Sequence, residues 1–194
     1  MGAALEVTMY YKNVIPLSEI VKQLGFLGYR IAVNNIEIFD DWLYTNHQVL
    51  EYNENTLNLN EILSDSKILL ANFTVNEYLC GYHILKADDG IYEVCIWLDL
   101  SKLPFLDNDI INNATRTFYK KITDEIVSNI DCEKLLLIGI GIETMIAYDK
   151  ALQNIVDNSK NILMWIFPKG REINIKPLFK KEEKDSFLIY SLEC

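Results

Sequence analysis

The sequence predicts an α+β (mixed α/β) fold, in which a mixed β-sheet with a central hairpin is packed by three or more helices. The chain has 194 residues, half of them hydrophobic, which suits a single globular domain spanning residues 1–194. Two stretches each have the pattern strand, helix, strand, and the pair Asp89-Gly90 is a strong signal for a tight hairpin. Together these observations favour a sheet with both parallel and antiparallel neighbours.

The first strand–helix–strand stretch occupies residues 4–33. Residues 4–12 alternate well enough for a strand, and residues 29–33 resume as another. Pro16 suits the first position of the helix between them and Gly28 suits its end. One face of this helix collects Leu17, Ile20, Val21, Leu24 and Leu27. Residues 36–66 contain short apolar runs broken by asparagines, which predicts short strands and loops.

The central hairpin is predicted with a defined register. A two-residue turn at Asp89-Gly90 sets the pairing along the two strands, which includes Asp88 with Ile91, Lys86 with Glu93, Tyr82 with Trp97, and Cys80 with Asp99. His83 then falls on an apolar face together with Leu85 and Val94, where we expect a hydrogen-bonded core histidine. Tyr82, Glu93 and Trp97 fall on the outer, half-exposed face.

A long helix is predicted over residues 109–130, because apolar side chains recur every four residues at Ile110, Ala114, Phe118, Ile122, Ile126 and Ile130. The second strand–helix–strand stretch follows. It combines a strand at residues 134–140, a helix that carries Met145, Tyr148, Leu152 and Ile155, and a strand at 161–167, with an expected right-handed crossover. Residues 168–184 are expected to be an exposed connection before a last strand at 186–192.

The segment Gly139-Ile-Gly141 resembles the start of a dinucleotide-binding turn, but the rest of that motif is missing. Thr144 stands where the third glycine belongs, and the next strand ends without the carboxylate that would hold a ribose. Glu143 would repel a phosphate at the helix N-terminus. We therefore interpret the glycines as a tight strand-to-helix corner and expect no nucleotide cofactor.

Metal and catalytic motifs are also missing from the sequence. The four cysteines form no C-x-x-C pair and indicate free thiols in a cytoplasmic protein. The histidines, His47 and His83, belong to no metal-binding motif, so we expect no metal and name no catalytic residue. A small hydrolase or transferase, with a site built from scattered carboxylates, Tyr and His, stays open as the alternative, because many active sites have no linear signature.

Charge gives the main functional indication. Residues 1–110 hold 16 acidic and 6 basic side chains, whereas residues 111–194 hold 12 of each, so the net charge of −10 comes from the first part. A strongly acidic chain is a poor nucleic-acid binder, and no apolar run is long enough to predict a membrane span. Such a charge either serves solubility alone or steers the chain towards a basic protein partner.

Aromatic side chains next to carboxylates favour the second explanation, because aromatic anchors dominate interface hot spots. The predicted partner-binding surface consists of Asp40, Asp41, Trp42, Tyr82, Asp88, Asp89, Glu93, Trp97 and Asp99.

In its general character the chain resembles the immunity proteins of bacterial polymorphic toxin systems. The features that carry this resemblance are the segment KADDGIYEVCIWLDL, residues 86–100, and the acid-rich first half. Immunity proteins are small, acidic and cytoplasmic, and they neutralise a cognate toxin by covering its active site. The resemblance therefore implies an acidic protein-binding module whose partner is a basic toxin domain.

Overall fold

The computed structural model describes residues 4–26, 30–52, 59–75, 78–99, 106–107, 110–111, 121, 124, 128, 131–171 and 173–192. Most of these residues belong to one antiparallel sheet of ten strands, with three short helices in the described part of the chain. The predicted mixed sheet packed by three or more helices is therefore wrong. All neighbouring strands of this sheet pair antiparallel, so the two strand–helix–strand stretches do not form parallel neighbours.

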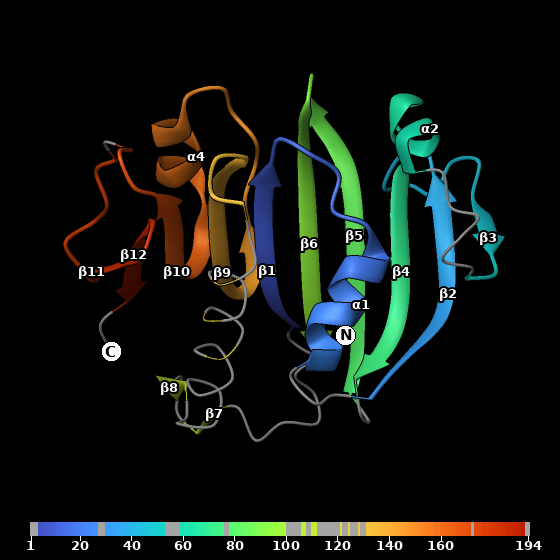
Figure 1. The fold of residues 1–194 in the computed structure, drawn as a ribbon, viewed down its shortest axis with the longest axis horizontal. Coiled ribbons are helices and arrows are strands. Elements are labelled where there is room, and N and C mark those ends of the chain that lie inside the picture. The colour runs from blue at the N-terminus through green and yellow to red at the C-terminus, as the bar shows by residue number, and fades with distance from the viewer. Residues whose placement is uncertain are drawn as a thin grey trace.

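The strands follow the order β11-β12-β10-β9-β1-β6-β5-β4-β2-β3 across the sheet (Figure 1). Their bounds are β1 Ala4–Tyr11, β2 Ile31–Phe39, β3 Gln48–Leu50, β4 Ile68–Val75, β5 Tyr78–Asp88, β6 Ile91–Asp99, β9 Leu135–Met145, β10 Lys160–Pro168, β11 Phe179–Lys184 and β12 Phe187–Leu192. A separate pair joins β7 Leu106–Asp107 to β8 Ile110–Ile111. The helices are α1 Leu17–Phe26, α2 Leu59–Ser64 and α4 Leu152–Asn158.

One face of the sheet carries the main hydrophobic core and is called the core face. It is built from alternating strand residues such as Val7, Tyr82 and Val94, and the helices α1 and α2 add Leu17 and Leu63. Helix α1 crosses in front of this face in Figure 1. The alternation of buried and half-exposed positions along β1 and β2 follows from the two-residue period of a strand.

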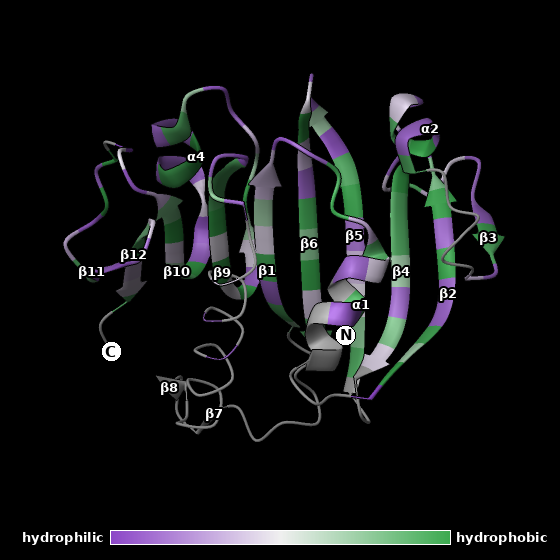
Figure 2. Cartoon of the chain, in the orientation of Figure 1, coloured by the Kyte–Doolittle hydropathy of each residue, from purple (hydrophilic) through white to green (hydrophobic). Residues whose placement is uncertain are grey.

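The opposite face is called the polar face. The strand register places these side chains on it: Glu6, Thr8 and Tyr10 of β1, Glu93, Cys95 and Trp97 of β6, His83 of β5, and Glu37 of β2. Two small hydrophobic clusters lie towards its ends, one around Trp165 next to α4 and one around Phe39. Hydrophilic bands alternate with hydrophobic ones along β2, β5 and β6 (Figure 2).

The central hairpin exists, but its register is not the predicted one. Asp88 faces Ile91 across the Asp89-Gly90 turn, and Gly90 takes the positive φ of 69° that such a turn needs. An irregularity between Lys86 and Asp88 then shifts the pairing by one residue, so that Trp97 faces Gly81 instead of Tyr82. Because side chains alternate, this bulge exchanges the faces of β5: Tyr82 enters the core, and His83 lies on the polar face.

Gly139 and Gly141 do not turn the chain, because β9 continues through both of them to Met145. A Cβ atom on Gly141 would lie 1.9 Å from the backbone oxygen of Asn161 in β10. A Cβ atom on Gly139 would lie 2.4 Å from the end of the Ile146 side chain. The interpretation as a strand-to-helix corner is therefore wrong: the glycines make room for a neighbouring backbone and for a side chain folded over the strand.

The predicted helix at 109–130 lies mostly outside the described residues. Within that range Ile110–Ile111 form β8, whereas Lys121, Asp124 and Ser128 are helical. Residues 179–184, expected to be a connection, form the edge strand β11, whose lysines and glutamates discourage pairing with other chains. No helix in the described part of the chain combines the length and the hydropathy needed to cross a membrane.

Candidate protein-interaction surface

Exposed hydrophobic side chains gather in the connection from β2 to β3 and in β3 itself. Of the seven large ones among the described residues, four lie between positions 42 and 49: Trp42, Leu43, Tyr44 and Val49. Leu43 is 88% exposed, and Trp42 and Tyr44 are about half exposed. Residues 40–47 are called the anchor loop. Its Trp and Tyr side chains are of the types enriched at protein–protein hot spots, and Leu43 between them extends the exposed apolar surface.

Asp41 fixes the backbone of the anchor loop. Its Oδ1 accepts a hydrogen bond from the Leu43 N–H at 2.8 Å, and its two oxygens accept from the Thr45 hydroxyl at 3.0 and 2.9 Å. The hydroxyl of Thr45, with backbone N–H groups, holds the pKa of Asp41 below its usual range. Asp40 adds a bond from Asn46 Nδ2 at 2.6 Å. The loop therefore presents its aromatic side chains from an ordered backbone.

Backbone strain is stored in the same loop. Tyr44 has φ 60° and Asn46 has φ 53°, in the left-handed region. Asparagine tolerates this region, but for a tyrosine it costs on the order of 1–3 kcal/mol, which the surrounding bonds must offset. The Tyr44 N–H donates to the Asp41 backbone oxygen at 2.9 Å.

The aromatic side chains of the loop pack against the polar face. Phe39, the last residue of β2, is fully buried, and its ring centroid lies 5.6 Å from that of Trp42 and 4.6 Å from that of Tyr44. The Trp42 ring also meets His83 of β5, with centroids 5.1 Å apart and an interplanar angle of 79°. This edge-to-face geometry joins the loop to the middle of the sheet.

Both histidines of the sequence pair with a glutamate on the polar face. His83 Nε2 lies 3.1 Å from Glu93 Oε1, and the Tyr10 hydroxyl donates to Glu93 Oε2 at 2.8 Å. His47 Nε2 lies 3.0 Å from Glu37 Oε2, and its ring meets Tyr44 edge to face. Burial raises the pKa of Tyr10, so its hydroxyl stays protonated and donates.

Four of the predicted site residues meet in this region. Asp40, Asp41 and Trp42 belong to the anchor loop, and Glu93 reaches Trp42 through His83. Trp97 lies on the same face, where its ring covers Gly81 so closely that a Cβ there would lie 1.9 Å from it. Sequence reasoning missed Tyr10 and the role of His83, because both depend on the register among β1, β6 and β5.

The other predicted residues lie elsewhere. Tyr82 is fully buried on the core face, where its hydroxyl donates to the Ile15 carbonyl at 2.6 Å, so its predicted place on the outer face is wrong. Asp88 and Asp89 form ion pairs at the hairpin turn, with Lys150 at 3.5 Å and Lys86 at 2.8 Å. Asp99 stands at the opposite end of β6, across from Ala4.

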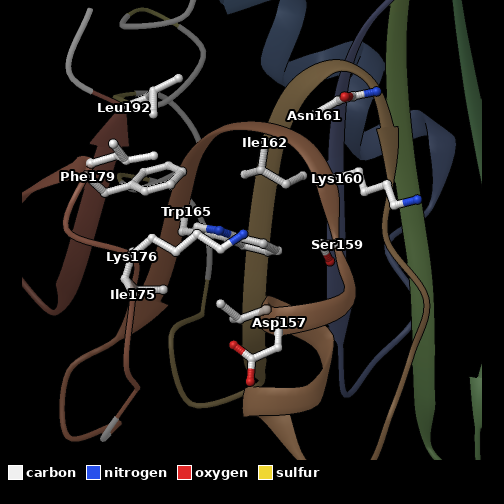
Figure 3. Close-up of a pocket in the computed structure, with 12 residues that line it drawn as sticks. Asp157, Ser159, Lys160, Asn161, Ile162, Trp165, Ile175, Lys176, Phe179 and Leu192 are labelled. Atoms are coloured by element: carbon white, nitrogen blue, oxygen red, sulfur yellow. The ribbon is translucent and has the colours of Figure 1, made fainter.

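A cavity of about 280 Å³ is lined by residues of α4, β10, β11 and β12, far along the strand order from the anchor loop (Figure 3). Trp165, Phe179 and Ile162 line it, and Lys160, Lys176 and Asp157 add charged groups. None of the predicted site residues lines this cavity. Its charges have both signs, so it favours no single class of ligand.

Metal and thiol chemistry find little support. Among the described residues, no three His, Cys, Asp or Glu side chains are grouped closely enough to hold a metal ion. Cys80, Cys95 and Cys132 are free thiols, as predicted, and burial raises the pKa of Cys95, which keeps it protonated and unreactive.

No family model, curated protein or solved structure matches the chain.

Proposed function

We propose that this protein is an acidic protein-binding module that neutralises a basic toxin domain by covering its active surface. The observation that carries the proposal is the anchor loop, where Trp42, Leu43 and Tyr44 stand exposed on a backbone fixed by Asp41. A preordered loop loses little entropy when it binds, so its apolar contacts convert efficiently into affinity. Contiguous exposed apolar side chains often mark a protein–protein interaction site.

The charge of the sequence around the loop favours a basic partner. Between Arg30 and Lys67 the chain has seven carboxylates and no lysine or arginine. A one-sign field of this kind speeds encounter with a positively charged surface and disfavours acidic partners. The partner that fits is a basic protein with an apolar socket for Leu43 and its two aromatic neighbours.

Several of the carboxylates have internal roles, which decides how charge should be tested. Asp41 and Glu93 accept hydrogen bonds that hold the loop and His83, so reversing their charge would disrupt the surface itself. Glu51 is exposed and directly follows β3. It is therefore the better position for changing the field without changing the loop.

The first experiment measures binding to the product of the reading frame next to this chain's own. Trp42→Ala should weaken binding by about 2 kcal/mol or more, roughly 30-fold, as truncation of a hot-spot residue does. Leu43→Ala should weaken it by roughly 1.5–3 kcal/mol, the burial energy of a leucine side chain. Leu178→Ala is the matched control, because Leu178 is also a surface leucine, 62% exposed, but lies outside the loop. Wild-type affinity in both loop variants would contradict the proposal.

The second experiment tests the charge. Glu51→Lys should slow association at low ionic strength, and the difference from wild type should shrink towards 1 M salt, where the Debye length is about 3 Å. Co-expression should meanwhile protect cells from the toxic partner, and Trp42→Ala should reduce that protection. If the association rate changes neither with Glu51→Lys nor with the salt concentration, this surface does not steer the partner.

A small hydrolase or transferase is the second candidate, and one observation favours it: Tyr10, His83 and Glu93 meet on the polar face. Two facts oppose it. Tyr10 is fully buried, and both oxygens of Glu93 already have partners inside the protein. An enzyme that used this cluster would lose turnover in Glu93→Gln but keep it in Leu43→Ala, whereas a binding module would lose affinity in Leu43→Ala.

A further inference from the structure

His83 lies beneath the most aromatic part of the anchor loop. Its side chain is only 14% exposed, and its ring meets the half-exposed ring of Trp42 at 5.1 Å between centroids. His47, the other histidine of the sequence, contacts Tyr44 and Phe39 instead. Trp42 therefore has one histidine neighbour, and the charge of that neighbour acts directly on the indole.

The orientation of His83 is set by two residues from neighbouring strands. Glu93 of β6 is 19% exposed, and its Oε1 lies 3.1 Å from His83 Nε2. Tyr10 of β1 donates to the other oxygen of the same carboxylate at 2.8 Å, which prevents Glu93 from rotating away. An ionised carboxylate only accepts hydrogen bonds, so Nε2 carries the imidazole proton and Nδ1 is the atom that gains one in acid.

The other described groups around His83 are apolar, protonated or paired with another residue. β6 also contributes Cys95, directly across from His83, and burial keeps that thiol protonated. β4 presents the apolar Leu70, and β2 presents Phe39 and Glu37, of which Glu37 is paired with His47. The carboxylates of the loop, Asp40 and Asp41, are bonded to Asn46 and Thr45. Glu93 is thus the carboxylate that His83 pairs with among the described residues.

We propose that His83 and Glu93 are positioning residues for Trp42, and that their hold on the anchor loop tightens as the pH falls. When His83 gains a proton, its hydrogen bond to Glu93 becomes an ion pair, which is the stronger interaction. The imidazolium also attracts the electron-rich ring of Trp42 as a cation does. Protonation of the imidazole therefore strengthens both contacts through which His83 holds the loop.

The consequence for partner binding rests on the proposed function, but the positioning itself is measurable on the isolated protein. The measurement is tryptophan emission from pH 8 to pH 5, because a charge in contact with an indole changes its emission. The wild-type chain should show a single titration. Trp42→Phe should abolish it, which assigns the signal to Trp42 instead of Trp97 or Trp165.

Variants of the two histidines supply a matched comparison. Each histidine pairs with a glutamate, but only His83 touches Trp42. His83→Gln should abolish the titration, and His47→Gln should preserve it. Glu93→Gln keeps a hydrogen-bond acceptor but removes the charge, so the titration midpoint should move to lower pH. A titration that survives in His83→Gln, or a midpoint that does not move in Glu93→Gln, would overturn the proposal.

Circular dichroism at pH 7 separates positioning from simple unfolding. His83→Gln should keep the wild-type spectrum, because glutamine can still donate to Glu93. A variant that unfolds is replaced by His83→Asn, which keeps a donor in a shorter side chain. If the emission titration behaves as expected but Leu43→Ala binds the partner normally, the proposed function fails and the positioning inference stands. If the emission titration is absent but Leu43→Ala loses binding, the positioning inference fails and the proposed function stands.

Discussion

Alanine at Gly141 should destabilise the fold far more than alanine at Gly139, although both glycines lie in the same strand. The added methyl group at Gly141 would lie 1.9 Å from the backbone oxygen of Asn161 and 2.8 Å from Thr144. A backbone atom cannot move aside without shifting β10, and Gly141 lies beside the irregular pairing of β9 with β10. At Gly139 the closest atom is the terminal Cδ1 of Ile146, at 2.4 Å, which a rotamer change can remove.

The magnitudes follow from the kind of obstacle. Overpacking costs roughly 1–3 kcal/mol when side chains can adjust and more when the backbone must, so we expect about 3 kcal/mol or more for Gly141→Ala and about 1 kcal/mol for Gly139→Ala. In a chain of this size 1 kcal/mol shifts the melting temperature by about 2–4 °C. Alanine also lowers the entropy of the unfolded chain, but by the same amount at both positions.

Thermal denaturation followed by circular dichroism measures the difference. Gly141→Ala should melt about 6–12 °C below wild type and Gly139→Ala about 2–4 °C below it. Equal decreases in melting temperature for the two variants would show that the backbone of β10 does not lie as close to Gly141 as the structure indicates. A wild-type melting temperature in Gly141→Ala would refute the close contact between Gly141 and β10. It would favour the interpretation of the two glycines as a turn.

Three further predictions concern the core and the anchor loop. Tyr82→Phe leaves the Ile15 carbonyl without its buried donor and should lower the free energy of unfolding in urea by roughly 1–3 kcal/mol. Phe73→Ala empties a fully buried position and should cost about 3–5 kcal/mol, whereas the partly exposed Leu79 on the neighbouring strand should tolerate alanine within about 1 kcal/mol. The pKa of Asp41 is lowered in the folded chain, so its hold on the loop is complete above about pH 4, the value of a free aspartate, and is lost as the pH falls through the lower folded value. Trp42 emission should report this loss in strong acid, and Asp41→Asn should abolish the change.

Local features of the fold could be predicted from the sequence. The strand expected at residues 4–12 forms over Ala4–Tyr11, and the helix signalled by Pro16 and Gly28 forms over Leu17–Phe26. The Asp89-Gly90 turn is also present. Alternation, helix ends and turn residues are properties of a few consecutive residues, so they are visible in a single sequence.

The pairing of distant strands could not be predicted. A strand–helix–strand pattern suggests parallel neighbours, but β9 and β10 pair antiparallel although α4 lies between them in the chain. β11 was missed because an edge strand of lysines and glutamates has no alternating hydrophobic pattern. Which strands become neighbours is decided by contacts across the whole sheet, and no local pattern records them.

The candidate site shows the same division. Asp40, Asp41 and Trp42 could be proposed from the sequence, because aromatic and acidic residues are adjacent there. Tyr10 was missed and His83 was placed in the core, since a one-residue bulge near Ala87 decides which face of β5 carries the histidine. A bulge inside a hairpin leaves no turn residue to mark it, so the faces beyond it are exchanged without a sequence signal.

The proposed binding loop is separate from the residues that stabilise the fold, and that separation can itself be tested. The core face holds the main hydrophobic cluster, whereas the anchor loop exposes its apolar side chains and contributes none of them to that cluster. Leu43→Ala should therefore leave the free energy of unfolding within about 0.5 kcal/mol of wild type, as surface substitutions do, while it weakens partner binding. Tyr82→Phe should do the opposite, because its hydroxyl bonds on the far side of the sheet from Trp42. If Tyr82→Phe weakens binding while the protein remains folded, or if Leu43→Ala lowers the melting temperature by several degrees, the two roles share residues and the loop is not an independent binding element.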